Sequence, residues 1–123
     1  MATYATTVPT SLADQLVTLT NLNSSVQNNV TGASTGKIWE IEGDATTSGG
    51  IPIYVKIADA SSATVGSTRP DLTLYFPPNE VSCYVFAEGH AYSSGVSLWA
   101  GTLPDDLVST QLPTGFTLKI VAS

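Results

Sequence analysis

The side chains that could do chemistry in this chain are few. Among 123 residues there is one histidine, His90, and one cysteine, Cys83. General acid-base and nucleophilic catalysis need such groups within hydrogen-bond reach of one another. A Ser-His-Asp set could be assembled from His90, Asp59 or Asp71 and one of many serines, but no Gly-x-Ser-x-Gly elbow supports it. We therefore expect no catalytic residues and no enzyme activity, and interpret His90 as a surface or loop histidine.

Metal and nucleotide sites are weakly indicated as well. Zinc sites need clustered Cys or His, and the sequence has no such cluster. Calcium is conceivable at Asp105-Asp106 or around Asp59 and Asp71, but the spacing of a calcium-binding loop is missing, so solvated loops explain these acids better. The glycine pattern of nucleotide-binding loops is also missing. We expect no metal and no cofactor.

The charge composition argues against two classes of partner. The formal net charge is −6, and only 11% of the residues are charged. The four basic residues lie singly along the chain, so no cluster is available to displace counterions from nucleic acid. No apolar run approaches the ~18 residues of a membrane span. No signal-peptide pattern is visible, so we expect a mature protein that starts at or near Met1. Neither nucleic acid nor a membrane is an expected partner.

The backbone that carries these residues is predicted to be all-β. Apolar residues occupy every second position in 51–57, 72–76 and 81–86, which is the period of a strand with one buried face. Cys83 falls in this register, so we expect a buried, inert thiol. The residues that the register assigns to the core are Ile53, Val55, Ile57, Leu72, Leu74, Val81, Val85, Leu118 and Ile120.

The segment 37–43 alternates in the same way. Trp39 and Ile41 should share one face, and Ile38 should lie on the other with two glutamates. This strand should present its acidic face to solvent or to a partner.

The remaining segments complete a single domain. In 12–30 the leucines have helical spacing, but the β-branched residues favour a strand, which we prefer. Short strands are also expected in 96–100 and 116–122. Six to eight strands with turns between them predict a β-sandwich or jelly roll over residues 12–123. Residues 1–11 are too small and polar to fold alone, so we interpret them as a flexible arm.

Aromatic side chains lie opposite the aliphatic rows. Such rings could stack on sugars, pack against a second sheet or lie at a subunit contact, and we favour burial against protein. The predicted subunit contact consists of Tyr54, Tyr84 and Trp99.

Three motifs in the middle of the chain resemble a known group of proteins. They are YVKIAD at 54–59, ATVGSTRP at 63–70 and DLTLYFP at 71–77, and the closing FTLKIVAS adds a terminal strand. The order resembles that of small virion structural proteins of tailed bacteriophages, especially cyanobacterial and marine phages. In that group a YLKLYD-like strand precedes an A-x-x-TVG-T-x-P loop and an LTLPLP-like strand. The resemblance runs from about Trp39 to the end and does not extend to the first 30 residues.

This resemblance implies a non-enzymatic virion protein. The role that we favour is a capsid cement or decoration protein that trimerises, contacts the major capsid protein and lies on the outer head shell. The alternative is a tail or fibre component that contacts host surface glycans, with a hydrolase on a jelly-roll scaffold as a third class. The resemblance carries no catalytic residues over to this chain.

Overall fold

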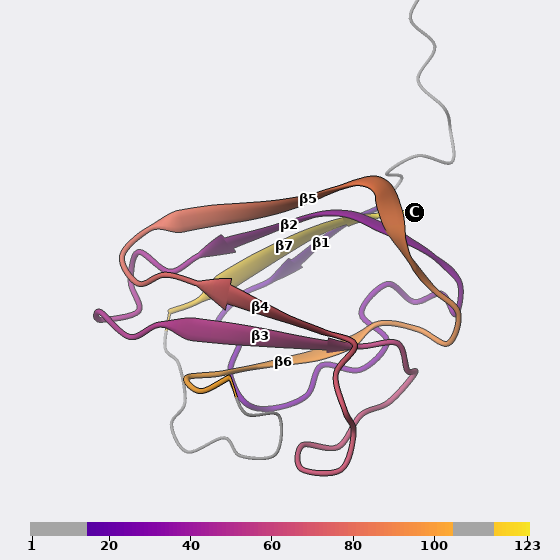
Figure 1. The fold of residues 1–123 in the computed structure, drawn as a ribbon, viewed down its shortest axis with the longest axis horizontal. Coiled ribbons are helices and arrows are strands. Elements are labelled where there is room, and N and C mark those ends of the chain that lie inside the picture. Colours follow the sequence, from indigo (N-terminus) through magenta and orange to yellow (C-terminus); the bar gives the residue numbers. More distant parts are fainter. Residues whose placement is uncertain (1–14, 105–114) are drawn as a thin grey trace, which may run out of the picture.

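The computed structural model describes residues 15–104 and 115–123, and within them the chain is all-β (Figure 1). The strands are β1 (Gln15–Leu19), β2 (Gly36–Asp44), β3 (Ile53–Ala58), β4 (Leu72–Phe76), β5 (Val81–Tyr92), β6 (Ser97–Gly101) and β7 (Thr117–Ala122). The strand preferred for 12–30 is confirmed over β1, and no helix occurs among the described residues. The arm predicted at 1–11 lies outside this part.

The strands form two antiparallel sheets that pack face to face (Figure 1). The four-stranded sheet has the order β1-β7-β2-β5, and the three-stranded sheet has the order β4-β3-β6. The prediction of a β-sandwich is therefore confirmed. A long loop joins β3 to β4, and Pro77 and Pro78 lie in the turn between β4 and β5.

Four of the pairings are nested along the chain. β1 pairs with β7, β2 pairs with β5, and β3 pairs with β4. The segment 23–30 follows β1 and pairs with β6, which precedes β7. Gln27 and Leu98 exchange both backbone hydrogen bonds there, at 2.8 and 3.0 Å. The chain thus folds back on itself like one long hairpin, and the β2–β7 and β3–β6 pairings join its layers.

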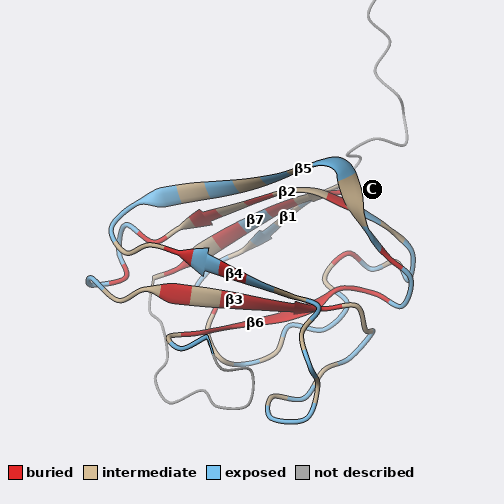
Figure 2. Ribbon diagram, viewed as in Figure 1, coloured by how far each residue is buried: buried red, intermediate tan, exposed pale blue. Residues whose placement is uncertain are grey.

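The hydrophobic core lies between the two sheets. Figure 2 shows mostly buried residues along β3 and β6, whereas β5 is largely exposed or intermediate. Most of the predicted core is confirmed: the buried members are Ile53, Val55, Ile57, Leu74, Leu118 and Ile120. Leu72 is half-buried and packs against this cluster. The last strand follows its predicted alternation, because Phe116, Leu118, Ile120 and Ala122 are all buried.

The prediction for β5 is wrong, because this strand faces the other way. Val81 and Val85 are 51% and 72% exposed, and Cys83 is exposed too. Tyr84 and Phe86 pack against the core instead. Both faces of the sequence VSCYVF are apolar enough to be buried, and the transfer free energy scales with area at roughly 25 cal/mol per Å². The larger aromatic rings therefore take the inner positions.

The prediction for β2 is wrong at Ile38, because the strand contains a bulge. Ile38 and Ile41 are both buried, although they are an odd number of positions apart. Trp39 is the extra residue relative to β7, and it lies opposite the segment 86–89 of β5. A bulge shifts the side-chain alternation by one residue. It therefore brings both isoleucines inward and leaves Trp39 half-buried.

The same substitution at two valines tests these orientations. Val55→Thr puts a hydroxyl group into the core and should lower the free energy of unfolding by about 1–3 kcal/mol. Val85→Thr changes an exposed side chain and should alter it by less than about 0.5 kcal/mol. Urea unfolding followed by tryptophan fluorescence measures both. An equal loss for the two variants would mean that β5 turns Val85 toward the core.

Candidate interaction surfaces

Two aspartates close the loop between β3 and β4. The carboxylate of Asp71 accepts the backbone N–H of Asp59 at 2.5 Å. The carboxylate of Asp59 accepts the backbone N–H groups of Ser93 and Ser94 at 3.0 and 2.8 Å. The N–H of Ser94 is the main cause that holds the pKa of Asp59 below its usual value, against a smaller opposing effect of burial. These carboxylates fasten the loop to the chain that follows β5.

The two aspartates considered for catalysis accept these backbone hydrogen bonds. His90 lies within β5, where it pairs with Ile38 and its ring centroid is 5.8 Å from that of Phe86. The hydrogen bonds described for Asp59 and Asp71 do not involve His90. Over 15–104 and 115–123, no group of three or more His, Cys, Asp or Glu side chains is placed to hold a metal. The pair Asp105-Asp106 lies outside these residues.

The described part of the chain also has no helix long and apolar enough to cross a membrane.

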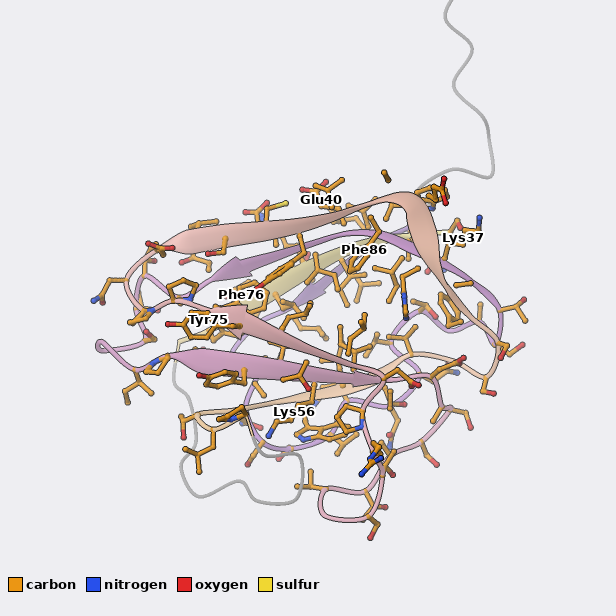
Figure 3. The ribbon with its side chains drawn as sticks, viewed as in Figure 1. Lys37, Glu40, Lys56, Tyr75, Phe76 and Phe86 are labelled. Carbon is orange, nitrogen blue, oxygen red and sulfur yellow. The ribbon has the colours of Figure 1, made fainter. Side chains whose placement is uncertain are left out.

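The outer face of the three-stranded sheet carries aromatic rings around a lysine. Lys56 of β3 is the register partner of Trp99 on β6, and both side chains are buried. Each alternates with core residues of its own strand, so both lie on the side of the sheet that faces away from the core. Figure 3 labels Lys56 on β3. Next along the sheet, the rings of Tyr54 and Tyr75 lie 5.2 Å apart, with Tyr75 43% exposed. We call Tyr54 and Tyr75 the tyrosine pair.

Tyr84 has a different position, on the inner side of β5. Its hydroxyl group donates to the backbone carbonyl of Tyr75 at 2.6 Å, and its ring meets Phe76 edge-on at 5.5 Å. It thus joins β5 of one sheet to β4 of the other. Of the residues predicted for a subunit contact, Tyr54 and Trp99 lie on the outer side of the three-stranded sheet, whereas Tyr84 lies on the inner side of β5. A subunit contact through them stays a prediction.

The outer face of the four-stranded sheet combines acidic and aliphatic residues, and Glu40 projects from it (Figure 3). Three carboxylates follow one another along β2, and the residues opposite them on β5 are the ones that the sequence had placed in the core. On the other side lie β7 and then β1. We call this surface the carboxylate face. Its members are Glu40, Glu42 and Asp44 of β2, Val81, Cys83 and Val85 of β5, Thr117, Lys119 and Val121 of β7, and Leu16 and Thr18 of β1.

Sequence reasoning found the acidic half of this face and missed the aliphatic half. The alternation of 37–43 had indicated an acidic surface, and the pairing confirms it for Glu40 and Glu42. The sequence register assigns the valines of β5 to the core, whereas the structure exposes them. The signal that could have corrected this is the presence of two large rings, Tyr84 and Phe86, on the opposite side of the same strand.

Two hollows lie beside the strands of this sheet. One, of about 130 Å³, lies on the carboxylate face between Glu42 and Asp44 of β2 and Thr117 and Lys119 of β7. The other, of about 400 Å³, is lined by uncharged residues from the end of β1 to Gln27.

The single cysteine forms a hydrogen bond with a glutamate of the carboxylate face. Cys83 Sγ donates a hydrogen bond to Glu40 Oε1 at 3.0 Å. This bond is the main cause that raises the pKa of the thiol from 9.0 to about 11, and burial and the charges of Glu40 and Glu42 add to it. Although Cys83 is exposed, its thiol is held in the protonated, weakly nucleophilic form.

Comparisons with protein-family models, with curated proteins and with solved structures return no match for this chain.

The raised pKa predicts slow alkylation of Cys83. At pH 8 a thiol of pKa about 11 has about 100-fold less thiolate than one of pKa 9.0. The greater nucleophilicity of a more basic thiolate recovers about tenfold, which leaves a net slowing of about tenfold. The test is the rate at which a maleimide alkylates Cys83, measured in the folded protein and in the urea-unfolded protein. Glu40→Gln should accelerate the folded reaction, and an unchanged rate in that variant would refute the assigned cause.

The lowered pKa of Asp59 predicts a pH-dependent contribution to stability. Its contribution is present above the unfolded pKa of about 3.8 and is lost as the pH falls through the lower folded value. Asp59→Asn should therefore melt below wild type at pH 7, and the gap in Tm should shrink below about pH 4. Thermal melts across this range test it, and a gap that stays constant into acid would contradict the assignment.

Proposed function

We propose that this chain is a non-enzymatic structural protein of a bacteriophage virion, a decoration or cement protein on the outer surface of the head. The motifs at 54–77 and the terminal strand support membership of that group by resemblance. A fold alone does not define a function, so the choice of role depends on the surfaces of the sandwich.

We also propose that the sandwich is a jelly roll. Jelly rolls combine two Greek keys in two packed sheets and are common among viral capsid domains. The nested pairing supports this: β1 with β7, 23–30 with β6, β2 with β5, and β3 with β4. The segment 23–30 lies where a fourth strand would extend the three-stranded sheet.

The observation that carries the proposal is the difference between the two outer faces. A protein that covers a shell needs one surface for its own copies and another for the lattice beneath. The tyrosine pair on the three-stranded sheet suits the first role, because aromatic residues are enriched in the buried centres of interfaces. The carboxylate face suits the second, since it has a different chemistry and lies on the opposite side of the molecule (Figure 1).

The assembly that follows from this division is a homotrimer on the major capsid protein. Closed rotational symmetry lets identical subunits bury one surface while all present another in the same direction. In such a trimer the tyrosine pair would contact neighbouring copies.

One observation favours the alternative role in a tail or fibre. The ring of Tyr75 is 43% exposed beside Tyr54 and could stack on a host glycan.

Sedimentation with separated heads and tails distinguishes the two roles. Purified protein is mixed with heads or tails of the phage that encodes it, and the pellet is assayed for bound chain. We expect saturable binding to heads and increased resistance of those heads to heat. Binding to tails alone would remove the cement proposal and support the fibre role, whereas binding to neither would remove both.

A further inference from the structure

The carboxylate face has an unusual composition for the solvent side of an antiparallel sheet. Such a face is normally polar, whereas here Val85, Leu16 and Val81 are 72%, 66% and 51% exposed. They lie on the two edge strands, β5 and β1, on either side of the acidic strand β2. Exposed aliphatic residues at the borders of a charged row are typical of an interaction surface rather than of a free one.

The charges of this face are arranged in a line. Glu40, Glu42 and Asp44 are successive outward residues of one strand, so their Cα atoms are about 7 Å apart. Val85, Cys83 and Val81 are their respective register partners, so each acidic residue has an uncharged neighbour on β5. A strand or extended segment laid along the face would meet the same repeat, because its own side chains alternate with the same period.

The face has a strong excess of negative charge. Its one cation is Lys119, the register partner of Glu42 on β7. The lysine of β2, Lys37, lies beyond the bulge, where its Nζ donates to the carbonyl oxygen of Glu88 at 3.2 Å and is 5.5 Å from the Trp39 ring. The excess charge is therefore available to a partner.

The excess negative charge also indicates whether the partner of this face is a second copy of the chain or a different protein. Two copies that met through this face would bring the two rows of carboxylates together, and like charges across an interface are strongly unfavourable. A partner with lysine or arginine between aliphatic residues would match both the charges and the valines.

We propose that the carboxylate face is the docking surface for a segment of the shell protein that carries lysine or arginine side chains between aliphatic residues. The identity of that partner as a shell protein rests on the proposed function. The recognition itself rests on Glu40, Glu42 and the valines of β5. Cys83 lies among them and is therefore a built-in reporter of contact.

The test compares two double variants that each remove two negative charges. Glu40→Gln/Glu42→Gln removes them from the face and keeps the size of both side chains. Glu80→Gln/Glu88→Gln is the matched control, since both residues are exposed and lie outside the face. We expect the first to weaken attachment to heads by about tenfold or more and the control by less than about twofold. Added salt should weaken the attachment of wild type and of the control variant to heads, and should weaken the attachment of the face variant much less.

A second readout is maleimide labelling of Cys83 on heads. Labelling should be blocked in the bound protein and return to its free rate on release. Heads that bind both double variants equally, with Cys83 still open to the reagent, would overturn the inference and leave the proposed function standing.

Failure of wild type to bind heads would remove the proposed function instead. Binding of a basic, aliphatic segment to the carboxylate face is then tested directly by titrating the protein with a synthetic peptide of alternating lysine and valine. Amide NMR shifts confined to β2 and β5, and lost in Glu40→Gln/Glu42→Gln but not in the control, would support it. Shifts spread over the molecule, or none, would overturn it.

Discussion

The structure depends on the nested antiparallel pairing that folds the whole chain back on itself. The first strand is held by the last, and each inner pair is enclosed by the next, until the β3–β4 hairpin closes the series. Most contacts therefore join residues far apart in sequence, which is costly in loop-closure entropy and gives slow folding for a domain of this size. The arrangement also places the two outer faces on opposite sides of the sandwich.

The packing of Phe76 in the core determines which residues of β5 face outward. Its ring packs 5.3 Å from Phe116 and 5.5 Å from Tyr84. It also lies directly over Gly43, where an added Cβ would come within 2.3 Å of it, so β2 needs a glycine there. Because Tyr84 turns inward to meet Phe76 and to bond the carbonyl of Tyr75, its neighbours on β5 must turn outward. The carboxylate face is thus a consequence of core packing.

The sequence predicts which side of a strand faces the core only where the two sides differ clearly in hydrophobicity. In β3 and β7 one side is aliphatic and the other largely polar, so Val55 and Ile120 could be assigned to the core without a structure. In β5 both sides are apolar, and only packing against Phe76 decides between them. The bulge at Trp39 has no local sequence signal, because it depends on the registers of two neighbouring strands at once.

The candidate site was harder to predict than the fold for the same reason. Its acidic row lies on one strand and could be inferred from 37–43, but its aliphatic borders come from two other strands, β5 and β1. The aromatic residues on the outer side of the three-stranded sheet differ in exposure. Tyr75, which packs against Tyr54, is exposed, whereas Trp99 is buried, and the sequence pattern does not separate the two cases. Surfaces built from distant segments become visible only when the pairing is known.

We propose that this sandwich lies on a phage head with its two faces in different roles. Cryo-electron microscopy of intact virions, at a resolution that shows side chains, tests it most directly. We expect density for the sandwich on the outer shell, with Glu40 and Val85 against the shell protein and Tyr54 and Tyr75 toward neighbouring copies. Density confined to the tail, or a carboxylate face that points into solvent on the head, would contradict it.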